Sequence, residues 1–147
     1  MPSLDLSKTF PTASISSAAA LALLEAARAA SRDLGIDATI AITDAAGHLK
    51  AFERADTARF LTIDVAIDKA WTAASFGLGT HVWATIVGQA EVAQLAHRPR
   101  LVAVGGGLPI VDDGRVVGGI GISGGNAQQD RAAAEIALKA MGFEVAA

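Results

Sequence analysis

The chain has 147 residues, the size of a single domain, and carries a formal net charge of −3 at pH 7. Its 52% hydrophobic and 18% charged residues exclude intrinsic disorder, and the absence of cysteine excludes a disulfide scaffold, a thiolate metal site and a cysteine nucleophile. The 12 lysines and arginines are scattered and no apolar run reaches membrane-spanning length, so we expect a cytoplasmic protein without nucleic-acid or membrane partners. So little charge on a small chain also predicts that some apolar surface is buried between subunits.

An apolar stripe near the N-terminus predicts the first helix, over residues 15–34. Its members recur at the spacing of one helix face: Ala20, Leu23, Leu24, Ala27, Ala30 and Leu34. Gly35 follows at the position of a left-handed C-cap. The apolar run 18–24 behind Lys8 also faintly resembles a secretory signal. Polar residues continue the helical spacing beyond that run, so we favour the helix, and a cleaved signal within residues 1–30 remains the alternative.

The rest of the chain alternates between short strands and helices. Strands are predicted over residues 38–43, 48–54, 101–104, 108–111 and 115–122. Further helices are predicted over residues 58–76, with Thr57 as a cap, over 81–94 and over 127–141. Turn sequences at 44–47 and 112–114 join neighbouring strands into antiparallel hairpins.

The predicted element order is α-β-β-α-α-β-β-β-α. It indicates a single α+β domain over residues 14–147, with residues 1–13 as an N-terminal extension. We expect an antiparallel β-sheet flanked by helices, because the apolar face of a sheet must be covered by another layer.

Residues Gly119 to Gly124 spell a literal G-x-G-x-x-G between a strand and a helix. A dinucleotide-binding fingerprint opens a βαβ unit, whereas only one helix follows here, so we expect no such site. We expect these glycines to let a helix approach the strand closely. The next residues, Ser123, Gly124, Gly125 and Asn126, present amide groups at a helix N-terminus, which predicts either an anion site or simple capping.

A second glycine-rich segment runs from Gly105 through Gly106 and Gly107 to Leu108 and Pro109. Three glycines weaken a strand and proline removes a ladder donor. Such a segment is tolerated where a ligand or another backbone comes close, and a bulge without a ligand is the alternative.

Several polar residues stand out against the apolar background. Lys69 lies among small apolar helix neighbours, so it either faces a pocket as an anion partner or base, or extends along the helix to water. The three histidines, His48, His81 and His97, match no local metal-binding spacing, and we predict no metal site. His97 belongs to the one dense basic cluster, residues 97–100. This cluster predicts either a binding site for a carboxylate or an exposed loop.

These motifs together resemble the GlcG/HbpS family of small haem-binding-type domains, also found as the C-terminal domain of PduO proteins. The resemblance covers about residues 14–143 and rests on five segments: Ile42–Leu49, Phe52–Asp56, Asp68–Ala70, Gly106–Ile110, and Val117–Gly125 with the downstream Asp130. It implies a profilin-like sandwich and self-association, from dimer to octamer. Some members bind haem, and others are associated with corrinoid or glycolate metabolism. Positions that match family motif residues are Asp44, Arg54, Lys69, Gly106, Gly107, Pro109, Ser123, Gly124 and Asp130.

The first functional hypothesis is therefore a small-ligand-binding protein that takes haem or a related tetrapyrrole in a subunit-associated pocket. Haem needs an apolar slot, an axial donor and cations for its propionates. The donors available in this sequence are His48, His81, His97 and Met141. The candidate ligand-binding residues are Arg54, Gly106, Gly107, Pro109, Ser123, Gly124 and Gly125.

Two other hypotheses stay open. One is a metal-independent isomerase, tautomerase or hydrolase for a small oxygenated or carboxylated metabolite. In it Lys69 is the base or anion partner, Asp44 or Asp130 the acid–base group or orienter, and Arg54 the carboxylate clamp. The Gly106–Pro109 segment brings backbone donors to the substrate. The other is a purely structural oligomeric protein without a ligand.

Overall fold

Four antiparallel strands form one sheet in the order β2-β1-β4-β3 in the computed structural model, which describes residues 6–146. The strands are β1 (Thr39–Asp44), β2 (Leu49–Arg54), β3 (Gly107–Asp112) and β4 (Arg115–Ser123). The helices are α1 (Ser17–Asp33), α2 (Leu61–Phe76), α3 (Thr80–Ile86), the 3-10 helix η1 (Ala90–His97) and α4 (Ala127–Ala140). The predicted α+β class with an antiparallel, helix-flanked sheet is confirmed.

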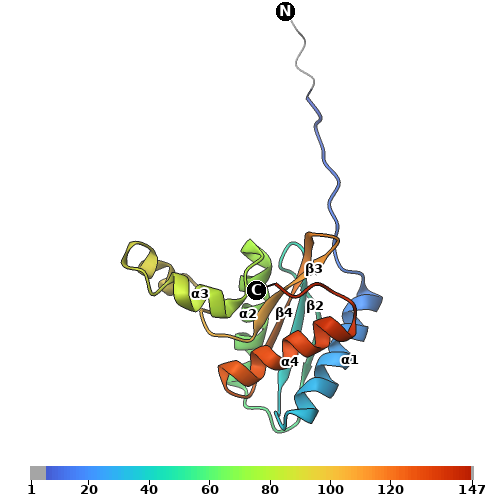
Figure 1. Cartoon of the computed structure of the whole chain (residues 1–147), viewed down its shortest axis with the longest axis vertical. Coiled ribbons are helices and arrows are strands. Elements are labelled where there is room, and N and C mark those ends of the chain that lie inside the picture. Colours follow the sequence, from blue (N-terminus) through green and yellow to red (C-terminus); the bar gives the residue numbers. More distant parts are fainter. Residues whose placement is uncertain (1–5, 147) are drawn as a thin grey trace, which may run out of the picture.

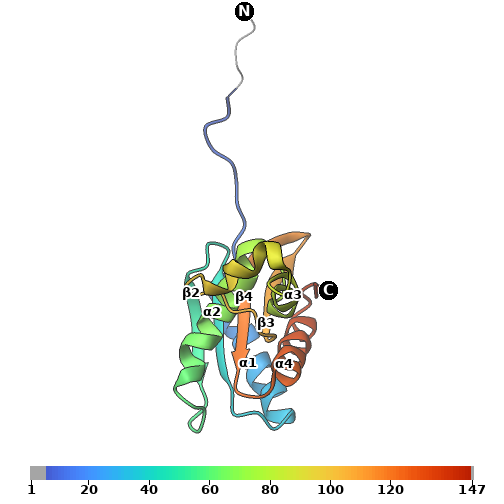
Figure 2. The same ribbon diagram turned by 90° about the vertical axis from the view of Figure 1, so that its left-hand side faces the viewer.

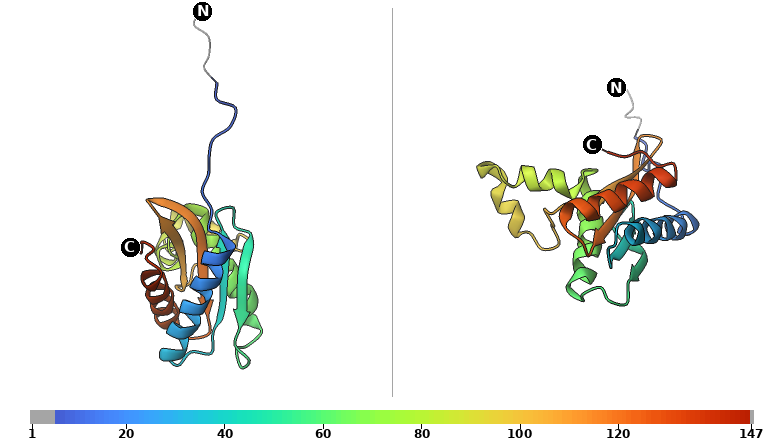
Figure 3. Two further views of the ribbon diagram at one scale, coloured as in Figure 1. Left: turned by 90° about the vertical axis from the view of Figure 1, so that its right-hand side faces the viewer. Right: turned by 60° about the horizontal axis from the view of Figure 1, so that its bottom comes forward.

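Helices cover both faces of the sheet (Figure 1, Figure 3). α1 and α4 lie side by side on one face, and α2 lies on the other. Most of the buried aliphatic side chains belong to the α1–α4 side, where Ile40 and Ile42 of β1 pack together with Ile120 and Ile122 of β4. The period-two alternation of these isoleucines is what directs them to the same face of the sheet.

The first helix forms as its sequence predicts. The Ser16 hydroxyl accepts the Ala19 amide at 3.1 Å and so satisfies one of the unpaired donors at the helix start. Gly35 takes a left-handed conformation, φ +71°, directly after the helix. The buried stripe of α1 consists of Ala20, Leu23, Leu24, Ala27, Ala30 and Ser31. The prediction was wrong for Leu34, which is 37% exposed at the C-cap.

Glycines on β4 let α2 approach the sheet closely, as predicted. A β-carbon added to Gly121 would collide with the carbonyl oxygen of Ala66 and lie 2.7 Å from the amide nitrogen of Ala70. One added to Gly119 would lie 3.1 Å from the β-carbon of Ala74. The interface between α2 and β4 is therefore built from backbone and alanine, with no room for larger side chains.

An arm made of α3 and η1 leaves the body between α2 and β3 (Figure 1). It points toward the viewer in Figure 2 and away from α1 in Figure 3. Its Trp83 is buried and meets Phe76 of α2 edge to face, with ring centroids 5.5 Å apart. No residue of η1 is buried. The helix predicted over residues 81–94 is thus two shorter elements that protrude from the sheet.

Two local predictions were wrong. Residues 101–104 form no strand. The Val102 amide donates to the Thr72 hydroxyl of α2 at 3.1 Å, so this segment bonds to a helix instead of joining the sheet. The observed order therefore has one strand fewer than predicted. Thr57 does not cap the next helix, which begins at Leu61 without a side-chain cap.

Pro109 is accommodated because β3 is an edge strand of the sheet. An edge strand leaves one side without ladder partners, so a missing backbone donor is tolerated there. The predicted N-terminal extension, residues 1–13, falls partly on residues 1–5, which lie outside the described residues. Residues 6–13 contain no helix or strand and extend away from the body (Figure 1). No helix between residues 6 and 146 has the length and hydropathy needed to cross a membrane.

Candidate functional site

A buried ion pair joins α2 to α4. The Lys69 ammonium donates to a carboxylate oxygen of Asp130 at 3.2 Å and to the carbonyl oxygen of Ile122 at 2.9 Å. Both charged residues are only 2% exposed. The other oxygen of Asp130 accepts the Gly125 amide at 2.8 Å. The pair therefore ties α2, the end of β4 and the start of α4 together.

Lys69 thus finds its anion partner within its own chain. Burial lowers the pKa of its ammonium, and the charge and hydrogen bond of Asp130 oppose that shift. Neither Lys69 nor Asp130 lines either of the two clefts described below. Their burial favours a structural role, and their use as catalytic groups stays a prediction.

Of the three glycines 105–107, Gly106 makes room for this ion pair, whereas Gly107 lies against the backbone of Lys69 and Gly105 against Ala127 and His81. A β-carbon on Gly106 would lie 2.7 Å from the Lys69 ammonium nitrogen and 2.8 Å from the Asp130 β-carbon, and the residue has φ +126°. One on Gly107 would lie 2.7 Å from Thr80. The space in front of this backbone is thus filled by the chain's own residues. Ligand contact by Gly106, Gly107 and Pro109 stays a prediction.

Asp44 organises the turn between β1 and β2. One of its carboxylate oxygens accepts the amides of Ala46 and His48, each at 3.0 Å. Gly47 has φ +86°, the positive value expected for this turn. The Asp44 carboxylate is therefore engaged in holding the hairpin, and no other predicted catalytic residue is among its hydrogen-bond partners.

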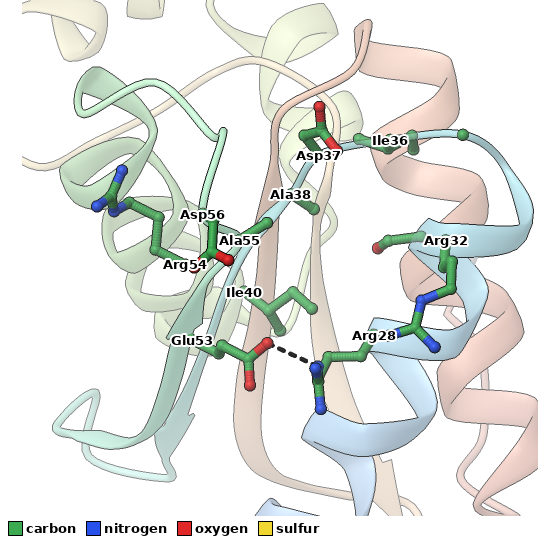
Figure 4. A pocket seen from close by; sticks show the side chains of 12 residues that line it. Arg28, Arg32, Ile36, Asp37, Ala38, Ile40, Glu53, Arg54, Ala55 and Asp56 are labelled. Carbon is green, nitrogen blue, oxygen red and sulfur yellow. Dashed lines mark ion pairs between the residues drawn. The ribbon is translucent and has the colours of Figure 1, made fainter.

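A cleft of about 590 Å³ lies between the C-terminal half of α1 and the end of β2; we call it the α1–β2 cleft (Figure 4). Its charged residues are Arg28, Arg32, Asp37, Glu53, Arg54 and Asp56. Arg28 and Glu53 pair across it at 2.6 Å. The guanidinium of Arg54 points away from the cleft and donates to the Ala58 carbonyl at 2.8 Å. The structure thus places Arg54 at the cleft without directing its charge into it.

A second cleft of about 310 Å³ adjoins the first and shares Gly35, Ile36 and Asp37 with it. Gly124 and Gly125 line it, together with Arg59. The nearby start of α4 is a capping box, in which the Asn126 side chain accepts the Gln129 amide at 2.8 Å. Of the two predictions for this helix start, capping is confirmed and anion binding stays a prediction. Ser123 lies at the end of β4 and does not line this cleft.

The four predicted iron donors occupy different environments. His48 lies on the β1–β2 turn with its side chain 81% exposed, and His97 ends η1 in an exposed position. Met141 packs against the core at the end of α4. His81 begins the arm, half-buried. Among residues 6–146, no group of three histidine, aspartate or glutamate side chains is placed to hold a metal ion.

His81 is the donor whose ring is partly enclosed by the chain. Its ring lies against Gly79, where an added β-carbon would be 2.6 Å from the ring nitrogen Nδ1 and 3.1 Å from Leu108. Within the described residues Nδ1 is buried without a hydrogen-bond partner. Burial lowers the pKa of His81; the positive charge of Arg131 lowers it further, and Glu135 opposes this. This lowering favours the neutral imidazole, the form that binds a metal.

Sequence reasoning missed most residues of the α1–β2 cleft. Arg28 and Arg32 are four residues apart on one helix face, just before Gly35, and that spacing is visible in the sequence. The opposite wall is contributed by Glu53 of β2 and by Asp56 of the turn that follows it, and only the fold brings this wall to α1.

Comparison with known proteins gives consistent matches. A family model described as "Haem degrading protein HbpS-like" matches residues 15–139. An uncharacterized 15.0 kDa protein of Citrobacter freundii is 33% identical over 90% of this chain and 96% of its own length. Klebsiella pneumoniae protein ORFY has a solved structure with TM-score 0.89 and 29% identity, covering 93% of this chain and 97% of that one. The crystal structure of a PduOC:heme complex has TM-score 0.81 and 28% identity, covering 91% and 99%.

Proposed function

This chain belongs to the HbpS-like family, and from that membership we propose that it binds haem or a closely related tetrapyrrole with His81 as the iron donor. The similar PduOC structure is that of a haem complex, which supports this ligand class. The observation that carries the choice of donor is the half-buried His81 imidazole, which lies against Gly79 and whose buried Nδ1 has no hydrogen-bond partner among the described residues. Burial also lowers its pKa, which favours the neutral form.

The chain offers the kinds of group that haem needs. Exposed apolar side chains that a haem could cover include Phe76, 73% exposed, and Val104, 51% exposed. Arg131 of α4, which pairs with Glu135 at 2.8 Å and remains 41% exposed, supplies a cation for a propionate. The clefts fit less well, because neither is lined by histidine or methionine. Self-association, in which a second copy covers such apolar surface, stays a prediction.

When bound, haem supplies a redox-active iron. The protein's own contribution is threefold: a neutral imidazole to hold the iron, apolar surface to exclude water from one haem face, and a guanidinium to orient a propionate. His81 lies beside Gly105, whose added β-carbon would be 3.5 Å from the His81 β-carbon. The Gly105 segment therefore limits where a haem edge can lie.

Titration of haemin into the protein tests this proposal. We expect a saturable shift of the Soret band that is lost in His81→Ala, because the iron then lacks its axial donor. His48→Ala and His97→Ala are matched controls and should keep the shift, since both side chains are exposed and lie on the β1–β2 turn and at the end of η1, away from the start of α3. Without a saturable shift in the unaltered protein, haem binding is refuted. Loss of the shift in a control while His81→Ala retains it refutes the donor assignment.

The lowered pKa of His81 predicts a distinctive pH dependence. Haem affinity should stay constant as pH falls through 6.5, the ordinary histidine value, and decrease only below the lower folded-state pKa. Between these two values the unfolded chain binds the proton more readily, so stability is expected to fall as pH falls through this window. Urea midpoints measured between pH 5 and pH 7 should show a steeper acid loss for the unaltered protein than for His81→Asn. An equal pH dependence of the urea midpoint in the two proteins would contradict the lowered pKa of His81.

A further inference from the structure

The α1–β2 cleft has two walls of opposite charge. Figure 4 shows Arg28 and Arg32 on the α1 wall, with Glu53 and Asp56 across from them and Asp37 at the upper end. Its floor is apolar and includes Ala38 and Ile40. A cavity with a cation on one side and anions on the other orients a dipolar guest, because each end of the guest is repelled by the wrong wall.

Pairing within the cleft determines which charges are free for a guest. Arg28 is neutralised by Glu53 at 2.6 Å, and it also contacts Glu25 at 3.3 Å. Within residues 6–146, Arg32, Asp37 and Asp56 take part in no ion pair and no side-chain hydrogen bond. One guanidinium and two carboxylates are therefore available. A simple anion would meet more negative than positive charge.

A buried hydroxyl in the same cleft also lacks a partner. Ser31 is 3% exposed and lines the cleft, and its Oγ atom has no hydrogen-bond partner among the described residues. Leaving a buried hydroxyl unsatisfied is unfavourable, so such groups normally have a partner. A guest with a polar atom near Ser31 would satisfy it.

We propose that the α1–β2 cleft binds a small zwitterion, with its carboxylate at Arg32, its ammonium at Asp37 and Asp56, and a polar atom within reach of Ser31. This site is separate from the haem site proposed at His81, because His81 does not line the cleft. It goes beyond haem binding by giving the protein a second ligand of different chemistry.

The test is calorimetric titration of the purified protein with a series of ω-aminocarboxylates from glycine to 6-aminohexanoate. For each length the carboxylate and the amine of the same carbon number are measured separately. We expect at least one zwitterion to bind saturably, with both half-charged counterparts weaker by roughly tenfold, since each forfeits one charge-assisted contact. No saturable binding by any zwitterion overturns the proposal. A carboxylate or amine that binds as tightly as its zwitterion also overturns it.

Variants locate the site. Arg32→Gln and Asp56→Asn should each weaken the best zwitterion roughly five- to tenfold, because the lost contacts lie at the exposed rim of the cleft. Arg98→Gln is a matched control, since Arg98 is exposed on the segment after η1 and is remote from the cleft. Ser31→Ala should weaken binding while the circular dichroism spectrum stays unchanged. Unchanged affinity in both rim variants refutes the site even if a zwitterion binds.

Discussion

Replacing Lys69 by methionine is expected to lower the free energy of unfolding by about 3–5 kcal/mol, the cost of leaving one member of a buried ion pair unpaired. The Asp130 carboxylate would keep only the Gly125 amide as a partner in a site that is 2% exposed. Urea denaturation followed by circular dichroism measures the loss.

Two comparisons show whether the buried charge is the cause. Lys139→Met removes an exposed lysine on α4 and should change stability by less than about 0.5 kcal/mol. Lys69→Met combined with Asp130→Asn should recover part of the loss, because the remaining amide is neutral and its oxygen still accepts from Gly125. A Lys69→Met variant as stable as the Lys139 control would show that the pair contributes little.

Adding one methyl group at Gly121 is expected to destabilise the protein by about 3 kcal/mol or more, because the new β-carbon collides with the Ala66 carbonyl. The colliding atoms belong to helix backbone, so relief requires α2 to move off the sheet. The change in urea midpoint is the measurement.

The matched control separates collision from backbone strain. Gly142 has φ +77° and open space at its β-carbon position, so Gly142→Ala is strained without a collision and should cost about 1 kcal/mol. A loss at Gly121 no larger than that at Gly142 would mean that α2 is not held against β4 as closely as the structure indicates.

The fold was largely predictable, because the apolar spacing and turn residues of each segment favour the same helices and strands that the packed layers require. The stripe of α1, the positive φ of Gly35 and Gly47, and the shared face of Ile40 and Ile42 all follow from residue spacing and glycine chemistry. The strand predicted over residues 101–104 failed for a tertiary reason. Its apolar letters suit a strand, but the Val102 amide bonds to Thr72 on another element, which no local pattern reveals.

The candidate site was less predictable, because its parts meet only through the fold. Lys69 and Asp130 are 61 residues apart, so the sequence can show an isolated lysine but cannot show its partner. The glycines beside them predict the close approach of a ligand or of another backbone, or a bulge without a ligand. In the structure the space at Gly106 holds the ion pair, and the space at Gly107 holds the backbone of Lys69. The walls of the α1–β2 cleft likewise come from separate elements.

The arm begins and ends at nearly the same place in the fold. The Gly107 amide donates to the Thr80 hydroxyl at 2.8 Å, which fastens the two ends of the excursion together. The position of β3 in the sheet is therefore set by this hydrogen bond and by its pairing with β4. The far end of the arm is not needed for either. The far end of the arm can therefore be shortened, extended or exchanged, during evolution or by engineering, while the sheet and the helices that cover it keep their shape. Closing a longer loop adds only about 0.6 kcal/mol for each doubling of length, so such remodelling carries little thermodynamic penalty.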